Sequence, residues 1–351
     1  MRTGSFSTRS LALILVLLCT SGCATIGKWK QEHREASLHR QQTEEAAAHN
    51  TESKAERVQR LKEAQDAARL PLLQRELAAR SDPDSLAASA VIEGLISGFD
   101  SSAARELAGR AAGAAPDRAE LALLQLQLCE SAPTCDPLPL EQHLRLLDPA
   151  NGVTWIYALL RADREHRPQD WETARAGLAQ AQRVDLYWNR IVSHLAKAVA
   201  GKAGFDSEAA LVEVVGAETA LMSALQPIAQ ACQSQELQRP GVLEQCRRIA
   251  AALRHGDTTV IEADGSSLAL RLWPQDSAER RAVVSERRVL RYRVDLMTHH
   301  ATQLNSPHAI GILAGLLTQY PSEQATMHAL YVQLGLKPDP PADWVDPRPD
   351  G

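Results

Sequence analysis

The sequence predicts an all-α protein whose helices pair into hairpins that stack on one another. Long stretches are rich in Ala, Leu, Glu, Arg and Gln, and only 4% of the residues are aromatic, which favours helix over sheet. Prolines that recur at a constant spacing indicate repeated units. The chain has 351 residues, 44% of them hydrophobic, enough to bury a core. Its formal charge of −5 argues against a nucleic-acid binder.

The first residues predict export. Arg2 and Arg9 precede an apolar run over residues 11–18, which is the pattern of a signal peptide. The run is far shorter than the roughly 20 residues that a permanent membrane-spanning helix needs. We therefore expect residues 1–22 to be a signal peptide that is removed.

Small residues precede Cys23 in the stretch Thr-Ser-Gly-Cys-Ala over residues 20–24. This stretch resembles the lipobox of bacterial lipoproteins, with Thr20 where that family usually carries an aliphatic residue. The resemblance implies that Cys23 is the lipid attachment site and the mature N-terminus. Ala24 after the cysteine implies transfer to the outer membrane, on its periplasmic face. The alternative is ordinary cleavage after Ala24, which would release a soluble periplasmic protein.

The cysteine count agrees with an oxidising compartment. The chain has six cysteines; Cys19 lies in the signal peptide and Cys23 would be lipidated, so an even number remains. Four cysteines allow three connectivities, and proximity in sequence favours two local pairs. Zinc is the alternative, but no C-x2-C or H-x3-5-H spacing accompanies these cysteines. We predict the disulfides Cys129–Cys135 and Cys232–Cys246.

Residues 23–80 are expected to form a lipid-anchored polar helical tether, because residues 28–68 are polar and carry mixed charges. A coiled coil is the alternative, since residues 58, 61, 68 and 72 are apolar and have the a/d spacing. Gln65 interrupts that seam, and nothing upstream continues it. Pro71 suits the first turn of a short helix at the end of the stretch.

Residues 81–185 contain an internal repeat. Pro83, Pro116 and Pro149 are each 33 residues apart, and periods of 33 to 34 residues are typical of helical hairpins. Second helices are expected near residues 101–114, 138–147 and 171–184. One hairpin cannot bury its apolar face alone, so neighbours must stack into a shared core. The same offset aligns two columns of apolar residues, Ala90, Leu123 and Ile156, then Val91, Leu124 and Tyr157.

The third unit resembles a tetratricopeptide repeat. The stretch over residues 147–151 leads into Trp155, and Ala174, Leu178 and Ala181 have the small/large/small spacing of that family's second helix. The stretch from Trp155 to Ala174 is longer than the motif allows, and bulky Leu159 replaces a small residue. The unit is therefore tetratricopeptide-like (TPR-like). The resemblance implies an α-solenoid that serves as a protein-interaction scaffold.

Residues 186–337 are expected to form a further helical-repeat-like domain. Helical patterning continues over residues 191–199, 208–232, 242–253, 277–303, 308–319 and 323–334. Residues 258–272 are ambiguous because Asp264-Gly265 between two apolar runs is also a hairpin signal. A lone hairpin is marginal in water, so helix is favoured there. Residues 338–351 predict a proline-rich surface tail, with Trp344 docking back.

The chain carries no motif of a known catalytic or phosphate-binding site, so we expect no enzyme, no catalytic residue and no cofactor. His299 and His300 cannot share one metal ion, because adjacent helical positions point about 100° apart. We expect no metal site.

One predicted helix is rich in arginine. Arginine planes bind carboxylates and phosphates well. Glu279, Glu286 and Asp295 share the helix, which favours a self-neutralised face; an anionic glycan, a lipid headgroup or an acidic partner is the alternative. The arginines are Arg280, Arg281, Arg287, Arg288, Arg291 and Arg293.

The predicted function is a periplasm-facing, membrane-anchored scaffold with a protein partner in the cell envelope. First helices of stacked hairpins line the concave side, and the 33-residue offset brings polar positions together near their ends. Glu130, Asp163 and Arg164 are therefore the predicted partner-binding residues. The alternative is a non-catalytic structural or ligand-binding periplasmic lipoprotein. A deep apolar pocket would favour that alternative, and an open polar-lined groove would favour the scaffold.

Overall fold

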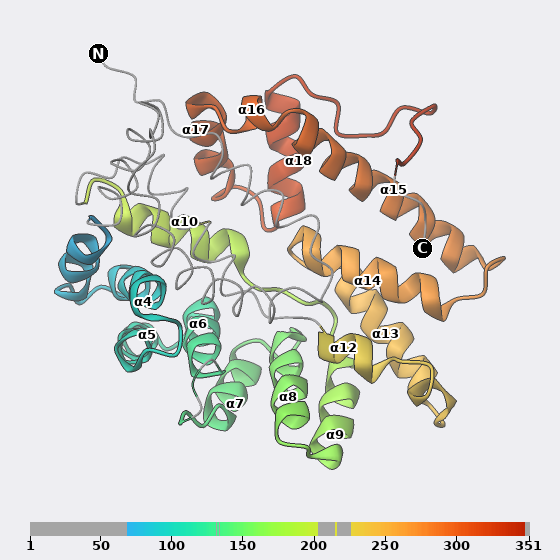
Figure 1. Ribbon diagram of the computed structural model, residues 1–351, viewed down its shortest axis with the longest axis horizontal. Helices are drawn as coiled ribbons and strands as arrows, with labels where there is room; N and C mark the ends of the chain where they lie inside the picture. The colour runs from blue at the N-terminus through green and yellow to red at the C-terminus, as the bar shows by residue number, and fades with distance from the viewer. Residues whose placement is uncertain (1–68, 131, 133, 203–214, 216–225, 348–351) are drawn as a thin grey trace, which may run out of the picture.

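The computed structural model describes residues 69–130, 132, 134–202, 215 and 226–347 (Figure 1). The signal peptide, Cys23 and the expected tether up to residue 68 lie outside these residues. Every regular element in the described part is a helix, which confirms the all-α prediction. The one β-type pairing recorded there is an isolated parallel bridge between Asn151 and Arg183.

Three helical hairpins follow one another, and each helix packs on the next along the chain. Asp82 and Ser101 accept hydrogen bonds from backbone amides in the first turns of the first two helices, as helix caps do. The aligned residues Ala90, Leu123 and Ile156 are all buried, as the period predicts. The helices are α4 (Pro83–Ser97), α5 (Ser102–Ala114), α6 (Ala119–Glu130), α7 (Leu138–Leu147), α8 (Val153–Arg164) and α9 (Pro168–Leu178).

The end of the expected tether belongs to the core. Residues 69–78 are helical, and Leu73 and Leu77 are fully buried against α4. The hydroxyl of Ser89 on α4 donates to the backbone oxygen of Gln74 at 3.0 Å. This part of the chain is therefore a packed helix and not a solvated tether.

The inner face of the hairpins is covered by later helices of the same chain. Helix α10 (Trp188–Val199) packs on α4 and α6, with Val192 and Leu195 buried in their cluster (Figure 1). Helix α12 (Gln226–Ala231) packs on α8 in the same way. Packing therefore continues across residue 186, where the sequence suggested a domain boundary.

The rest of the chain is also helical. The 3₁₀ turn η1 (Glu236–Gln238) precedes the α13–α14 pair, and the C-terminal helices continue from there. Ile310 of the C-terminal part joins the cluster around α4 and α10. The α-helices are α13 (Val242–Arg254), α14 (Thr259–Leu272), α15 (Ala278–His299), α16 (Ala301–Leu304), α17 (Pro307–Leu316) and α18 (Glu323–Gln333).

The ambiguous segment at residues 258–272 is a helix, and Asp264-Gly265 lies inside it. Thr258 caps its start by accepting from the amide of Ile261. A Cβ on Gly265 would come within 2.6 Å of the backbone nitrogen of Arg254 and 2.7 Å of the Cβ of Leu253. The glycine that suggested a turn therefore allows α13 and α14 to approach closely.

None of the helices in the described ranges combines the length and the apolar character that crossing a membrane requires.

We predict that Gly265→Ala destabilises the protein by roughly 1–3 kcal/mol, because its methyl group overlaps α13. Gly311→Ala in α17 is the matched control, since a Cβ there meets nothing within 4 Å and alanine favours helix. Urea denaturation followed by circular dichroism measures both variants. A neutral or stabilising Gly265→Ala would contradict the close approach.

We also predict a pH-dependent effect of Asp264→Asn. Burial raises the pKa of Asp264 from 3.8 to about 6, while Arg271 lowers it. A carboxyl whose pKa is raised by folding stabilises the protein below the unfolded pKa, and that stabilisation is lost as the pH rises through the folded value. At pH 7.5 Asp264→Asn should therefore gain about 1–3 kcal/mol over the parent. The gain should vanish at pH 3.5, and a gain of equal size at both pH values would exclude ionisation of Asp264 as its cause.

Candidate functional site

Two of the three predicted partner-binding residues contact each other. Arg164 at the end of α8 donates to Glu130 at the end of α6 at 2.7 Å. Burial raises the pKa of Glu130, although the guanidinium of Arg164 lowers it, and only 9% of the Glu130 side chain is exposed. Asp163 is exposed, and its side chain has no recorded hydrogen bond or ion pair to the described residues.

The Glu130–Arg164 pair joins neighbouring repeats. Arg118, just before α6, and Asp84, in the first turn of α4, form another pair between neighbouring hairpins at 2.6 Å, with the same separation of 34 residues but at the helix starts. Asp84 also lies 3.1 Å from Nδ1 of His194 on α10, which ties the first hairpin to the helix that covers it. Glu130 and Arg164 thus contact each other between neighbouring hairpins, and partner binding by Glu130, Asp163 and Arg164 stays a prediction.

Both predicted cysteine pairs are bonded in the structure. Cys129 and Cys135 join the end of α6 to the loop before α7. Cys232 and Cys246 join the end of α12 to α13. The second bond therefore fixes α13 against the helix that packs on α8.

An open pocket of about 510 Å³ lies between the turn after α9 and the second half of α13. Ala179 and Ala252 are buried and form its floor. The polar side chains around it are exposed. The complete lining is Ala179, Gln180, Ala181, Gln182, Arg248, Ala251, Ala252 and His255.

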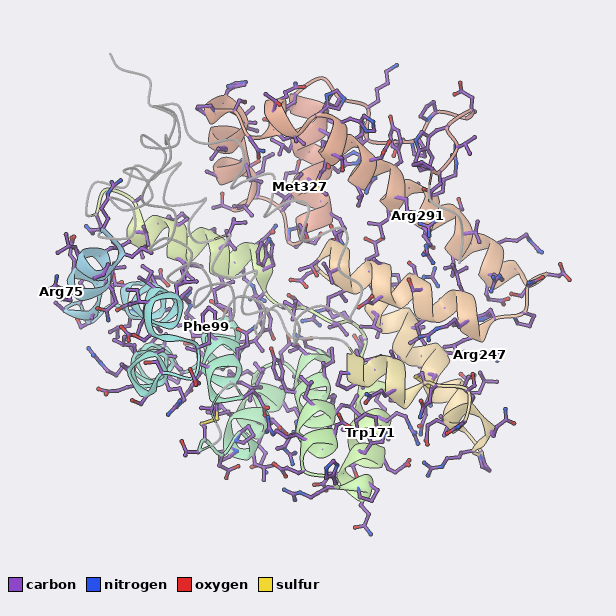
Figure 2. All side chains as sticks on the ribbon, viewed as in Figure 1. Arg75, Phe99, Trp171, Arg247, Arg291 and Met327 are labelled. Atoms are coloured by element: carbon purple, nitrogen blue, oxygen red, sulfur yellow. A yellow bond between two sulfur atoms is a disulfide. The ribbon has the colours of Figure 1, made fainter. Side chains whose placement is uncertain are left out.

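The walls of this pocket, the α9–α13 pocket, are held by buried polar contacts. Arg175 of α9 is 1% exposed and donates to Gln245 of α13 at 3.1 Å. The same guanidinium pairs with Glu236 of η1 at 2.9 Å. Arg247 of α13, labelled in Figure 2, also lies over the ring of Trp273 after α14, 5.5 Å from the ring centroid. The Arg175 contacts tie α9 to α13 and to η1, and the Arg247 contact ties α13 to the end of α14.

The α9–α13 pocket is positively biased. Arg248 supplies a cation, and no acceptor for it is recorded in the described part of the chain. His255 ends α13 beside the last backbone carbonyls of the helix. Gln180 and Gln182 add amide donors and acceptors, and none of the lining residues is acidic. Such a lining suits a carboxylate-bearing group from outside.

Sequence reasoning missed this pocket. Its residues come from two segments about 70 positions apart, and each segment reads as an ordinary solvent-facing surface. The only available signal was Arg248, a basic residue on the polar side of an amphipathic helix. Such a residue is usually solvated.

Two arginines of the arginine-rich helix α15, Arg291 and Arg293, lie beside carboxylates of another segment. Arg288, Arg291 and Arg293 contact the C-terminal tail over residues 338–346. Glu286 on the same helix pairs instead with Arg254 of α13 at 3.0 Å. The expectation of a self-neutralised helix was wrong in this respect, because the acidic tail folds back. His299 lies beside Asp295, and no group of three possible metal ligands occurs among the described residues.

Comparison of the chain with family models, with curated proteins and with solved structures found no match.

Proposed function

We propose that this protein is a lipid-anchored, periplasm-facing scaffold that holds a carboxylate-bearing segment of a protein partner in the α9–α13 pocket. The observation that carries this proposal is the pocket's open shape and its lining by two glutamines, one arginine and one histidine. A ligand-binding lipoprotein would call for a deep apolar pocket. The lining also lacks a serine, cysteine or carboxylate, so it is suited to binding rather than to nucleophilic chemistry.

The anchor rests on the lipobox-like residues before Cys23 and on the short apolar run of the signal peptide. A lipidated cysteine carries more than one acyl chain, which holds a protein far more firmly than a single chain. The resemblance to lipoproteins supports an outer-membrane position, because Ala24 rather than aspartate follows the cysteine.

The repeat architecture supports the scaffold role. Helices α4 to α9 form consecutive hairpins, and we propose that they are TPR-like repeats in an α-solenoid. Covering of the inner face by α10 and α12 leaves less of the usual concave surface for a partner. The α9–α13 pocket lies where the third hairpin meets the next part of the chain, and we place the main partner contact there.

The lipid anchor predicts that Cys23→Ala releases the protein into the soluble periplasmic fraction. Cys19→Ala, which leaves Cys23 in place, should stay with the membrane. Cell fractionation and the intact mass of the purified chain measure both outcomes. Membrane association of Cys23→Ala, or an unmodified Cys23 thiol in the parent, would contradict the anchor.

The pocket predicts site-specific capture of a partner in living cells. A photo-crosslinking amino acid at Gln182 should trap a protein segment that contains Asp or Glu, whereas one at the exposed Arg110 of α5 should not. Arg248→Glu should remove the crosslink at position 182 by repelling the carboxylate, and Arg110→Glu should leave it intact. Mass spectrometry of the crosslinked peptides identifies the segment.

A crosslink at Gln182 that survives Arg248→Glu would show that the charge of Arg248 does not recruit the partner. In that case the exposed end of α8, with Asp163 and Arg164, becomes the surface to test.

A further inference from the structure

The C-terminal tail is bound along one side of α15. A single guanidinium nitrogen of Arg288 donates to the backbone oxygens of Pro341 at 2.7 Å, Ala342 at 3.3 Å and Trp344 at 2.9 Å. Trp344 also donates its amide to the oxygen of Pro341, which closes a turn at this point. Arg288 therefore binds the backbone oxygens of a turn.

Side chains of the tail supply two further anchors. The ring of Trp344 meets the ring of Tyr292 edge to face, with centroids 5.3 Å apart, and Arg288 lies 5.6 Å from the Trp344 ring. Asp346 accepts from Arg291, which is labelled in Figure 2, at 2.6 Å. Positions 288, 291 and 292 share one face of a helix, so these contacts form one continuous surface.

The tail and the face of α15 that it covers also carry opposite charges. The tail over residues 338–351 contains four aspartates and one arginine. The helix opposes them with Arg288, Arg291 and Arg293, and the last of these lies 3.5 Å from Asp339. The groups that α15 contacts are backbone carbonyls, an indole ring and carboxylates. A separate chain with the same groups can make the same contacts.

The surface also extends past the tail. Val284 lies one turn before Arg288 on the same face, and it is 44% exposed although it is a large hydrophobic residue. The tail leaves this position open, so a longer segment gains additional apolar contact there.

We infer that the face of α15 formed by Val284, Arg288, Arg291 and Tyr292 is a binding site for an extended, proline-rich, acidic protein segment anchored by Trp-x-Asp. The chain's own tail occupies this site in cis. A tethered segment acts at an effective concentration of about millimolar, so a partner must compete with the tail. This second site and its internal competitor go beyond the proposed function, which concerns the α9–α13 pocket.

The test uses a fluorescein-labelled peptide of residues 337–347 and the full chain, with binding measured by fluorescence anisotropy. Trp344→Ala with Asp346→Asn weakens the tail, and this opened chain should bind the peptide roughly tenfold or more tightly than the parent chain does. Adding Arg288→Ala to the opened chain should weaken binding by roughly tenfold, because it removes the carbonyl contacts and the contact with the indole.

Arg281→Ala in the opened chain is the matched control. Arg281 lies on the same helix but bonds the backbone oxygen of Asp276, away from the tail, so its removal should leave peptide affinity unchanged. A peptide that itself carries Trp344→Ala and Asp346→Asn should not bind, and this readout does not depend on the folding of any chain variant.

Absence of saturable binding to the opened chain would overturn the proposal, and so would an affinity that Arg288→Ala leaves unchanged. A parent chain that dimerises with increasing concentration, and loses the dimer on Trp344→Ala, would assign the surface to a second copy of this chain instead.

Discussion

The rest of the fold depends on the buried carboxylate of Asp257. It accepts the backbone amides of Leu186 at 2.8 Å and Trp188 at 3.0 Å, so it caps α10 from a segment about 70 residues away. Burial and the nearby Asp185 carboxylate raise its pKa well above the usual value, and the two amides oppose that rise. Glu323 repeats the arrangement by accepting the amide of Thr259 at 2.8 Å, and its own amide donates to the oxygen of Asp257. The starts of α10, α14 and α18 thus meet at one polar junction.

This junction determines which surfaces of the described hairpins are covered by the chain itself. With its start held by Asp257, α10 lies against α4 and α6 and contributes Ile191, Val192 and Leu195 to their apolar cluster. The surface that an open array of hairpins would offer is therefore used for the protein's own packing. The polar side chains that could contact another molecule lie instead at the α9–α13 pocket and on the tail-covered face of α15. Both carry arginine side chains, and the scaffold that we propose would use them to bind acidic protein segments.

Local signals in the sequence predicted local structure well, because caps, periods and short-range pairings act within a few residues or one repeat. Asp82 and Pro83 start α4, and the bonds Cys129–Cys135 and Cys232–Cys246 join neighbouring elements. Docking of Trp344 was also expected, but its partners on α15 were not. Contacts between segments far apart in the chain produce no local sequence pattern. From the sequence alone, Asp257 resembles any acidic loop residue and Arg248 any solvent-exposed arginine. Asp264-Gly265 suggested a turn, but the structure has a helix there. The glycine lacks a side chain, which allows α13 to pack closely against α14.

The most direct test of the account is native-state hydrogen exchange on Asp257→Ala, resolved by residue. If the carboxylate holds the junction together, exchange should accelerate at Leu186 and Trp188, whose amides donate to it. It should also accelerate at the starts of α14 and α18, whose amides donate no hydrogen bond to the removed side chain. Asp276→Ala, at an exposed aspartate before α15, should change none of these amides. Acceleration confined to Leu186 and Trp188 would contradict the claim that one buried carboxylate couples the hairpins to the C-terminal helices.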